Sequence, residues 1–206
     1  MGFLQDAAGN AATGDDPGCR DVPRGACRSI NDTLGQFALV SYIPDPLAIF
    51  LDDLRIELTP WAKPRAHVTI LPPRPHEEDL DETIERLQVN SKPFHSFPVE
   101  VGKIEIFAAS NVVYLGFAFG SDELRRLYKA LNNGPLRYTE NFPYHPHVTI
   151  AQNIEPESAS KLAQLAVDKW SKYQGPRSFV IDRLSFVQHV APSVWVDVAT
   201  LSLSPE

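Results

Sequence analysis

Hydrophobic positions from residue 37 onward alternate between short β-prone runs and longer stripes with helical spacing. A run that keeps its apolar character over five to seven residues and stops at proline is typical of a strand. Apolar residues that recur every three to four positions mark one face of a helix. In the first half, these patterns predict a strand at 37–43, a helix over 47–58, a strand at 66–71 that ends at Pro72-Pro73, and a helix over 80–87.

The second half of the chain repeats the strand–helix alternation and adds strands on either side of it. We expect strands at 97–106 and 112–119, a helix over 121–131, a strand at 147–150, a helix over 156–173, and closing strands at 179–187 and 194–203. Mixed elements in this order favour an α+β fold in which helices pack outside sheets.

Residues 1–34 differ from the rest of the chain, because they are rich in Gly, Ala and Asp and show little apolar periodicity. Such a segment cannot bury enough apolar surface to offset the entropy of ordering it. We expect residues 1–34 to be a disordered extension and residues 35–206 to form a single domain, which suits a chain of 206 residues.

The most informative feature is an internal repeat of the tetrapeptide His-Val-Thr-Ile, which occurs at 67–70 and again at 147–150. A short proline-containing segment precedes each copy, and a predicted helix follows it. Matching motifs in matching halves suggest a duplicated unit.

Side chains alternate across a strand, so residues two apart share a face. His67 and Thr69 therefore face one way, His147 and Thr149 do the same in the second copy, and the Val and Ile residues between them face the core. Two imidazoles and two hydroxyls that converge suit displacement at phosphorus: one His acts as base, the other as acid, and the hydroxyls hold the non-bridging oxygens.

Both motifs resemble those of the two-histidine (2H) phosphoesterase superfamily, specifically its bacterial 2′,5′ RNA ligase-like branch. The family pattern is His-x-Thr/Ser followed by an apolar residue, and the segments His67-Val68-Thr69-Ile70 and His147-Val148-Thr149-Ile150 match it in full. The resemblance implies a bilobal, duplicated fold with two antiparallel sheets flanking a cleft and helices outside. One departure is Gln152, where family members often carry a basic residue.

The same resemblance implies a metal-independent phosphodiesterase that needs no cofactor. Its reaction would be hydrolysis of a 2′,3′-cyclic phosphate, on an RNA end or a small nucleotide, to a 2′-phosphate. A reversible 2′,5′ RNA ligase activity, which joins RNA ends, is implied as well. We expect a monomer. The sequence does not distinguish which of the two histidines is the base and which is the acid.

Charge and hydropathy limit the kinds of partner that the protein is expected to bind. A net charge of −7 argues against a protein that coats nucleic acid, which needs clustered Lys and Arg, although it allows a small site for one or two phosphates. No apolar run approaches the roughly 20 residues of a membrane-spanning helix, and the N-terminus lacks a signal-peptide pattern. We expect a cytoplasmic protein without membrane contact.

Two alternatives stay open at this point. A nucleotide- or RNA-binding module of the same fold would have negligible turnover. A metal-dependent phosphohydrolase would use His145 with His67 and His147 as ligands.

Around the two motifs, several side chains are candidates for substrate contacts. They are Tyr144 and His145 beside the second motif, the basic residues Arg65, Arg74, Lys103 and Arg126, and the aromatic residues Tyr42, Phe107 and Trp195 as base-stacking groups. His76, His95 and His189 show no partner pattern, so surface or loop positions are expected for them.

Overall fold

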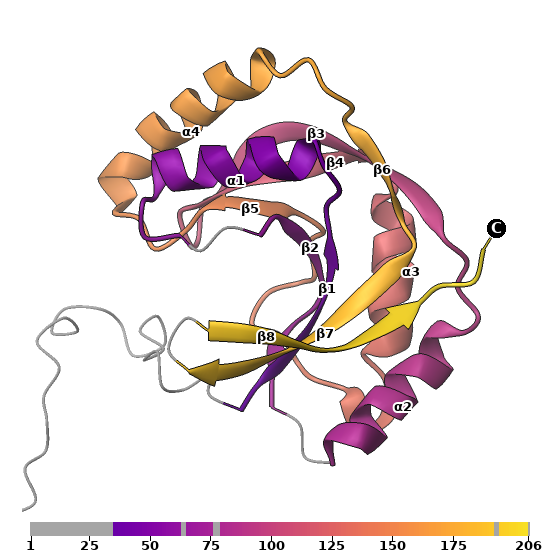
Figure 1. Cartoon of the computed structure of the whole chain (residues 1–206). Helices are drawn as coiled ribbons and strands as arrows, with labels where there is room; N and C mark the ends of the chain where they lie inside the picture. The colour runs from indigo at the N-terminus through magenta and orange to yellow at the C-terminus, as the bar shows by residue number, and fades with distance from the viewer. Residues whose placement is uncertain (1–34, 63–64, 76–78, 192–193, 206) are drawn as a thin grey trace, which may run out of the picture.

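The computed structural model describes residues 35–62, 65–75, 79–191 and 194–205. Two four-stranded antiparallel sheets form the framework (Figure 1). The first has the order β2-β1-β7-β8, with β1 (Phe37–Tyr42), β2 (His67–Arg74), β7 (Arg183–Ala191) and β8 (Val194–Ser202). The second has the order β5-β4-β3-β6, with β3 (Phe97–Phe107), β4 (Val112–Phe119), β5 (Val148–Ala151) and β6 (Ser178–Ile181).

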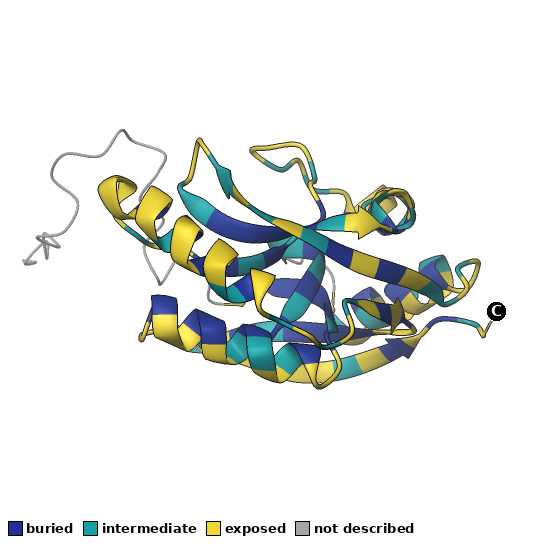
Figure 2. Cartoon of the chain, turned by 90° about the horizontal axis from the view of Figure 1, so that it is seen from above, coloured by how far each residue is buried: buried dark blue, intermediate teal, exposed yellow. Residues whose placement is uncertain are grey.

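Four α-helices and a short 3₁₀ turn (Gly134–Leu136) accompany the sheets in the described part of the chain. The helices are α1 (Leu47–Leu58), α2 (Leu80–Ser91), α3 (Ser121–Leu131) and α4 (Pro156–Ser171). Figure 2 shows them exposed on their outer sides and buried where they meet the sheets. The predicted α+β, bilobal arrangement of two antiparallel sheets with helices outside is confirmed.

The two sheets show the duplication that the repeated tetrapeptide predicts. The units β1–α1–β2 and β4–α3–β5 occupy equivalent places, and in each sheet the strand that carries the motif lies at the edge. The helices are exchanged between the units: α1 packs against β5, and α3 packs against β2. Each lobe therefore contributes a helix to the motif strand of the other.

One large hydrophobic core extends through both lobes, and a second, small cluster is formed by Ala38, Val40 and Val187. Val68, Ile70, Val148 and Ile150, the apolar members of the two motifs, are all buried in the large core, at 0–1% exposure. This alternation fixes the opposite face of each motif strand for the polar residues between them. The proposed boundary between residues 34 and 35 stays a prediction, because residues 1–34 lie outside the described part of the chain.

Two predicted strand limits are wrong. Strand β2 continues through Pro72 and Pro73 to Arg74, which is possible because β2 is an edge strand and a proline there removes no ladder bond on its free side. The predicted strand at 179–187 is two strands that separate at Asp182, with β6 in one sheet and β7 in the other. No described helix is long and apolar enough to cross a membrane.

Candidate functional site

The two motif strands lie against each other where the sheets meet, because β2 and β5 are the edge strands of their sheets and are in contact (Figure 1). A side chain links them directly: the Tyr144 hydroxyl donates to the Thr69 carbonyl oxygen at 2.9 Å. His67 and Thr69 are partly exposed, whereas Val68 and Ile70 are buried. Each strand therefore keeps its His and Thr on the face that is not in the core.

Both imidazoles are held in the same way, by the carbonyl group two residues earlier in the chain. His67 Nδ1 lies 2.8 Å from the Arg65 carbonyl oxygen, and His147 Nδ1 lies 2.7 Å from the His145 carbonyl oxygen. A carbonyl oxygen only accepts, so each Nδ1 must carry the hydrogen. In the neutral ring this leaves Nε2 with a lone pair, which can take a proton from a reactant or return one.

Burial lowers the pKa of both histidines. The pKa of His67 falls to about 4, mainly through desolvation, and the bond to the Arg65 carbonyl offsets part of the effect. The positive charges of Arg55 and of a protonated His147 lower it further. Desolvation likewise lowers the pKa of His147. The mutual effect of the imidazoles means that a proton on one opposes a proton on the other.

A polar network from three other elements borders His67. The guanidinium of Arg65 lies 3.3 Å from the centre of the Tyr42 ring and forms an ion pair of 2.6 Å with Asp197 of β8. The Tyr42 hydroxyl donates to the same carboxylate at 2.5 Å. On α1, Asp52 accepts the backbone N–H of Arg65 at 2.9 Å. The residue whose carbonyl holds His67 is thus itself held at both its backbone and its side chain.

Sequence reasoning did not find Asp52 and Asp197. No spacing rule connects either aspartate to the first motif, because they come from a different helix and from the last strand. Asp197 comes to the site through the sheet order β2-β1-β7-β8, and Asp52 comes from α1, which follows β1 in the chain.

Aromatic rings border His147. Phe107 and Tyr114 stack with centres 3.9 Å apart, and the imidazoles of His145 and His147 meet the Phe107 ring edge-on at 5.3 and 5.0 Å. Tyr114 also lies opposite Thr149 in the β4–β5 pairing. His145 is exposed beside this stack, and Tyr144 stacks on Tyr128 of α3. The structure therefore brings Tyr144 and His145 close to the motifs.

Arg74 lies at the other end of β2 from His67 and is only 1% exposed. Its guanidinium donates to Asn132 Oδ1, the Leu136 and Pro72 carbonyls and Glu140. Protein acceptors therefore occupy the groups with which Arg74 was predicted to bind substrate, and the structure does not bring it together with the histidines.

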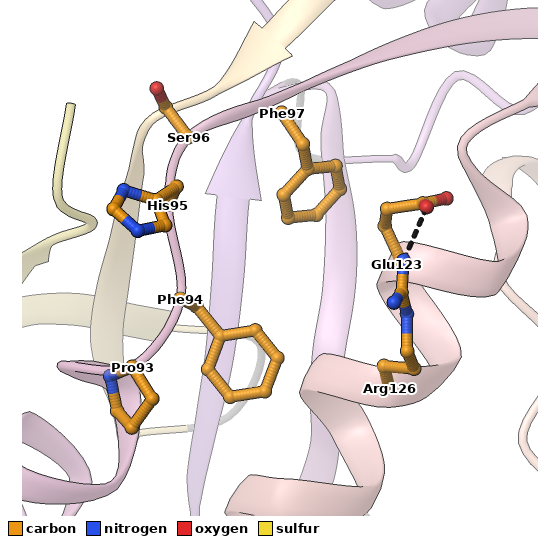
Figure 3. A pocket seen from close by; sticks show the side chains of 7 residues that line it. All are labelled: Pro93, Phe94, His95, Ser96, Phe97, Glu123 and Arg126. Atoms are coloured by element: carbon orange, nitrogen blue, oxygen red, sulfur yellow. Dashed lines mark hydrogen bonds and ion pairs between the residues drawn. The ribbon is translucent and has the colours of Figure 1, made fainter. Parts of the chain in front are cut away.

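Arg126 also stands apart from the histidines. It lines a cavity of about 460 Å³ between α3 and the segment that leads into β3, together with Phe94, Phe97 and Glu123 (Figure 3). An ion pair of 2.5 Å joins Arg126 to Glu123. Neither motif histidine lines this cavity.

The remaining candidates are scattered. Lys103 and His95 are exposed, as is Trp195, which stacks on His189. His189 was expected at the surface or in a loop, but it is 3% exposed on β7, so that prediction is wrong. Alternation places it on the same face of β7 as Val187, opposite the main core, where the Trp195 ring stacks on it. His76 lies outside the described residues.

A metal centre at His67, His145 and His147 finds no support in the geometry. Among the residues that the structure describes, no three His, Cys, Asp or Glu side chains are placed to hold a metal ion.

Comparisons with known proteins agree on one family. The sequence profile of the 2′-5′ RNA ligase superfamily matches residues 43–192, which include both motifs. A Halalkalibacterium halodurans protein named "Putative phosphoesterase BH1439" is 25% identical over 150 residues, which cover 68% of this chain and 84% of that protein.

Solved structures share the fold. The structure of E. coli LigT complexed with phosphate has a TM-score of 0.56 at 14% identity, and the match covers 82% of this chain and 98% of LigT. The protein TT0787 of Thermus thermophilus has a TM-score of 0.59 at 15% identity, covering 83% and 99% of the two chains. Since the family profile spans well over half of the sequence, the chain belongs to the 2′-5′ RNA ligase superfamily, a class of two-histidine phosphoesterases.

Proposed function

We propose that the protein is a phosphodiesterase that opens 2′,3′-cyclic phosphates on RNA ends or small nucleotides and leaves a 2′-phosphate. The observation that carries this proposal is the matched Nδ1–carbonyl bond in both motifs. It gives two imidazoles, on adjoining strands, whose Nε2 atoms form no hydrogen bond with the described residues and can transfer a proton. A protein that only bound nucleotides would not need two rings in the same tautomer.

The proposed reaction is a displacement at phosphorus. One imidazole removes a proton from water as the water oxygen bonds to phosphorus, and the other, protonated, gives its proton to O3′ as the P–O3′ bond breaks. The Thr69 and Thr149 hydroxyls donate to the non-bridging oxygens. With a ribose 5′-hydroxyl as the nucleophile in place of water, the same displacement would form a 2′,5′ linkage and release O3′ as a hydroxyl.

Protonation and substrate binding are coupled in this scheme. In the free protein both pKa values lie below the ordinary 6.5, so both imidazoles are neutral at pH 7. An anionic phosphate between them favours the charged form of the ring beside the leaving oxygen. The acid is thereby charged when the substrate arrives, and no metal or nucleotide cofactor enters the scheme.

A panel of substrates tests this function. The four nucleoside 2′,3′-cyclic phosphates and an RNA ending in a cyclic phosphate would be incubated with the full chain, with and without excess EDTA. We expect turnover to the 2′-phosphate, resolved from the 3′-isomer by chromatography, at the same rate in both conditions. Loss of turnover in EDTA would favour a metal-dependent phosphohydrolase, and nucleotide binding without turnover would favour a binding module.

The pH optimum of kcat/KM should be acidic. The free protein needs one neutral and one protonated imidazole, and it loses the single proton as pH rises through the higher pKa of the pair. Because both values are below 6.5 and that of His67 is about 4, kcat/KM should follow a bell with its maximum below pH 6.5. Bound phosphate raises both values, so the kcat bell should lie at higher pH.

Steady-state rates from pH 4 to 9 check this, with circular dichroism at each pH to show that the protein stays folded. A kcat/KM that continues to rise above pH 8 would contradict the assignment of the two imidazoles.

A further inference from the structure

Arg55 is a buried cation that pairs with no acceptor in the described part of the chain. It lies on the inward stripe of α1 with Leu51, Leu54 and Leu58, and it is 8% exposed. With the residues that the structure describes, its side chain forms neither a hydrogen bond nor an ion pair. Desolvation lowers its pKa, and the nearby charge of Asp52 offsets this in part. Arg74, the other buried arginine of the described chain, is saturated with acceptors instead.

The position of Arg55 relates it to both motifs. Helix α1 packs against β5, which carries Thr149 (Figure 1). One turn before Arg55, the carboxylate of Asp52 accepts the N–H of Arg65, two residues before β2 begins. The charge of Arg55 also acts directly on His67, whose pKa it lowers. The guanidinium is therefore near His67, although it comes from a helix and not from either motif.

The guanidinium of Arg55 is costly to the fold, because it is largely desolvated and no acceptor of the described chain pairs with it to balance its charge. None of its nitrogens is among the fully enclosed side-chain atoms of the described residues that lack a partner, so the group still reaches solvent. The cost falls when an anion arrives, since a guanidinium can give two parallel hydrogen bonds to phosphate oxygens. The segment of the second motif, from His147 to Gln152, contains no Lys or Arg, so it does not itself supply a cation.

We propose that Arg55 is the cationic contact for the substrate phosphate, reaching the histidine pair from α1 and supplying the charge that position 152 lacks. This inference rests on the proposed phosphodiesterase function. It also gives the site a sequence of events. Without an anion, Arg55 opposes protonation of His67; with phosphate bound, its charge is balanced and His67 can carry the proton.

Inorganic phosphate is the probe, measured by isothermal titration calorimetry against the full chain. We expect Arg55→Met to weaken phosphate binding by roughly 10- to 100-fold, the range for hydrogen bonds to a charged group. Arg55→Lys should lose less, because a point charge remains without the bidentate geometry. The control is Arg126→Met, which removes an exposed arginine that stands apart from the histidines and should leave the phosphate Kd within about twofold.

Thermal stability should distinguish the two buried arginines, Arg55 and Arg74. Arg74→Met should lower Tm, whereas Arg55→Met should leave Tm unchanged or raise it, because it removes an unpaired buried charge. An NMR titration of the His67 ring should show a higher pKa in Arg55→Met, since a like charge is gone. If that variant does not fold, Arg55→Lys carries the same comparison through its phosphate Kd.

Wild-type affinity for phosphate in Arg55→Met, or in Arg55→Lys should Arg55→Met not fold, would overturn the role of Arg55 and leave the proposed function standing. If the protein binds phosphate through Arg55 but shows no turnover, the role of Arg55 in phosphate binding stands and the proposed function is overturned. Failure of the wild-type chain to bind phosphate would overturn both.

Discussion

Replacing His67 or His147 by alanine is expected to lower turnover of a 2′,3′-cyclic phosphate by roughly 10²–10⁴-fold, the usual contribution of general acid–base catalysis. Each imidazole presents Nε2 and is held by the same backbone contact. Because the reaction uses one ring as base and the other as acid, a single remaining ring cannot take over the part of the other. Single-turnover rates measure the chemical step itself. Substrate binding should survive each change, because neither ring is the only group that contacts the phosphate.

The expected pattern across variants is specific to a pair that acts as a unit. The double histidine variant should be little slower than the slower single variant, because effects within a catalytic unit are not additive. Thr69→Ala and Thr149→Ala should cost less, since each hydroxyl is one of several donors to the phosphate. His95→Ala, an exposed histidine that lies outside the motifs, is the control and should turn over normally.

Near wild-type turnover in either His67→Ala or His147→Ala would end the two-histidine mechanism for this protein. A nucleotide-binding module would then be the better description.

The sequence predicts the faces of the two motif strands well, because alternation is a local property. Val68 and Ile70 had to be buried if the segment was a strand, and His67 and Thr69 then had to face away from the core. The repeat adds that the second copy repeats this arrangement. These two facts also predict the fold class, because a duplicated strand–helix–strand unit needs a sheet for each copy.

What the sequence could not predict depends on contacts between distant segments. The apolar pattern runs on through Asp182, so nothing local shows that the chain leaves one sheet there and enters the other. Arg55 did leave a signal, since a basic residue interrupts an otherwise leucine-rich helix face. Its meaning depends on β5, which lies far along the chain.

The role of Arg74 also could not be predicted from the sequence. Its position suggested a substrate contact, but its surroundings are those of a structural cation. Arg74 holds the segment after α3, from Asn132 to Glu140, in place. Its guanidinium binds the Leu136 carbonyl, Asn132 Oδ1 and, at 2.7 Å, Glu140, whose side chain is 17% exposed. Asn132 Oδ1 also accepts the backbone N–H of Tyr138. One buried cation thus ties the edge of the first sheet to the chain that leads to the second motif.

Arg74→Met is therefore expected to lower the free energy of unfolding by about 3–5 kcal/mol, the usual cost of removing one partner from a buried ion pair. The loss arises because Glu140 and the Leu136 carbonyl keep their burial and lose this donor. Urea unfolding followed by circular dichroism measures it, and a lower midpoint with an unchanged m-value would show a loss of stability alone. Arg183→Met, which removes an exposed arginine paired with its neighbour Asp182, is the control and should unfold at the wild-type midpoint. Equal midpoints for Arg74→Met and the wild type would show that the four acceptors find other donors or water, and that the segment from Asn132 to Glu140 is fixed by its backbone alone.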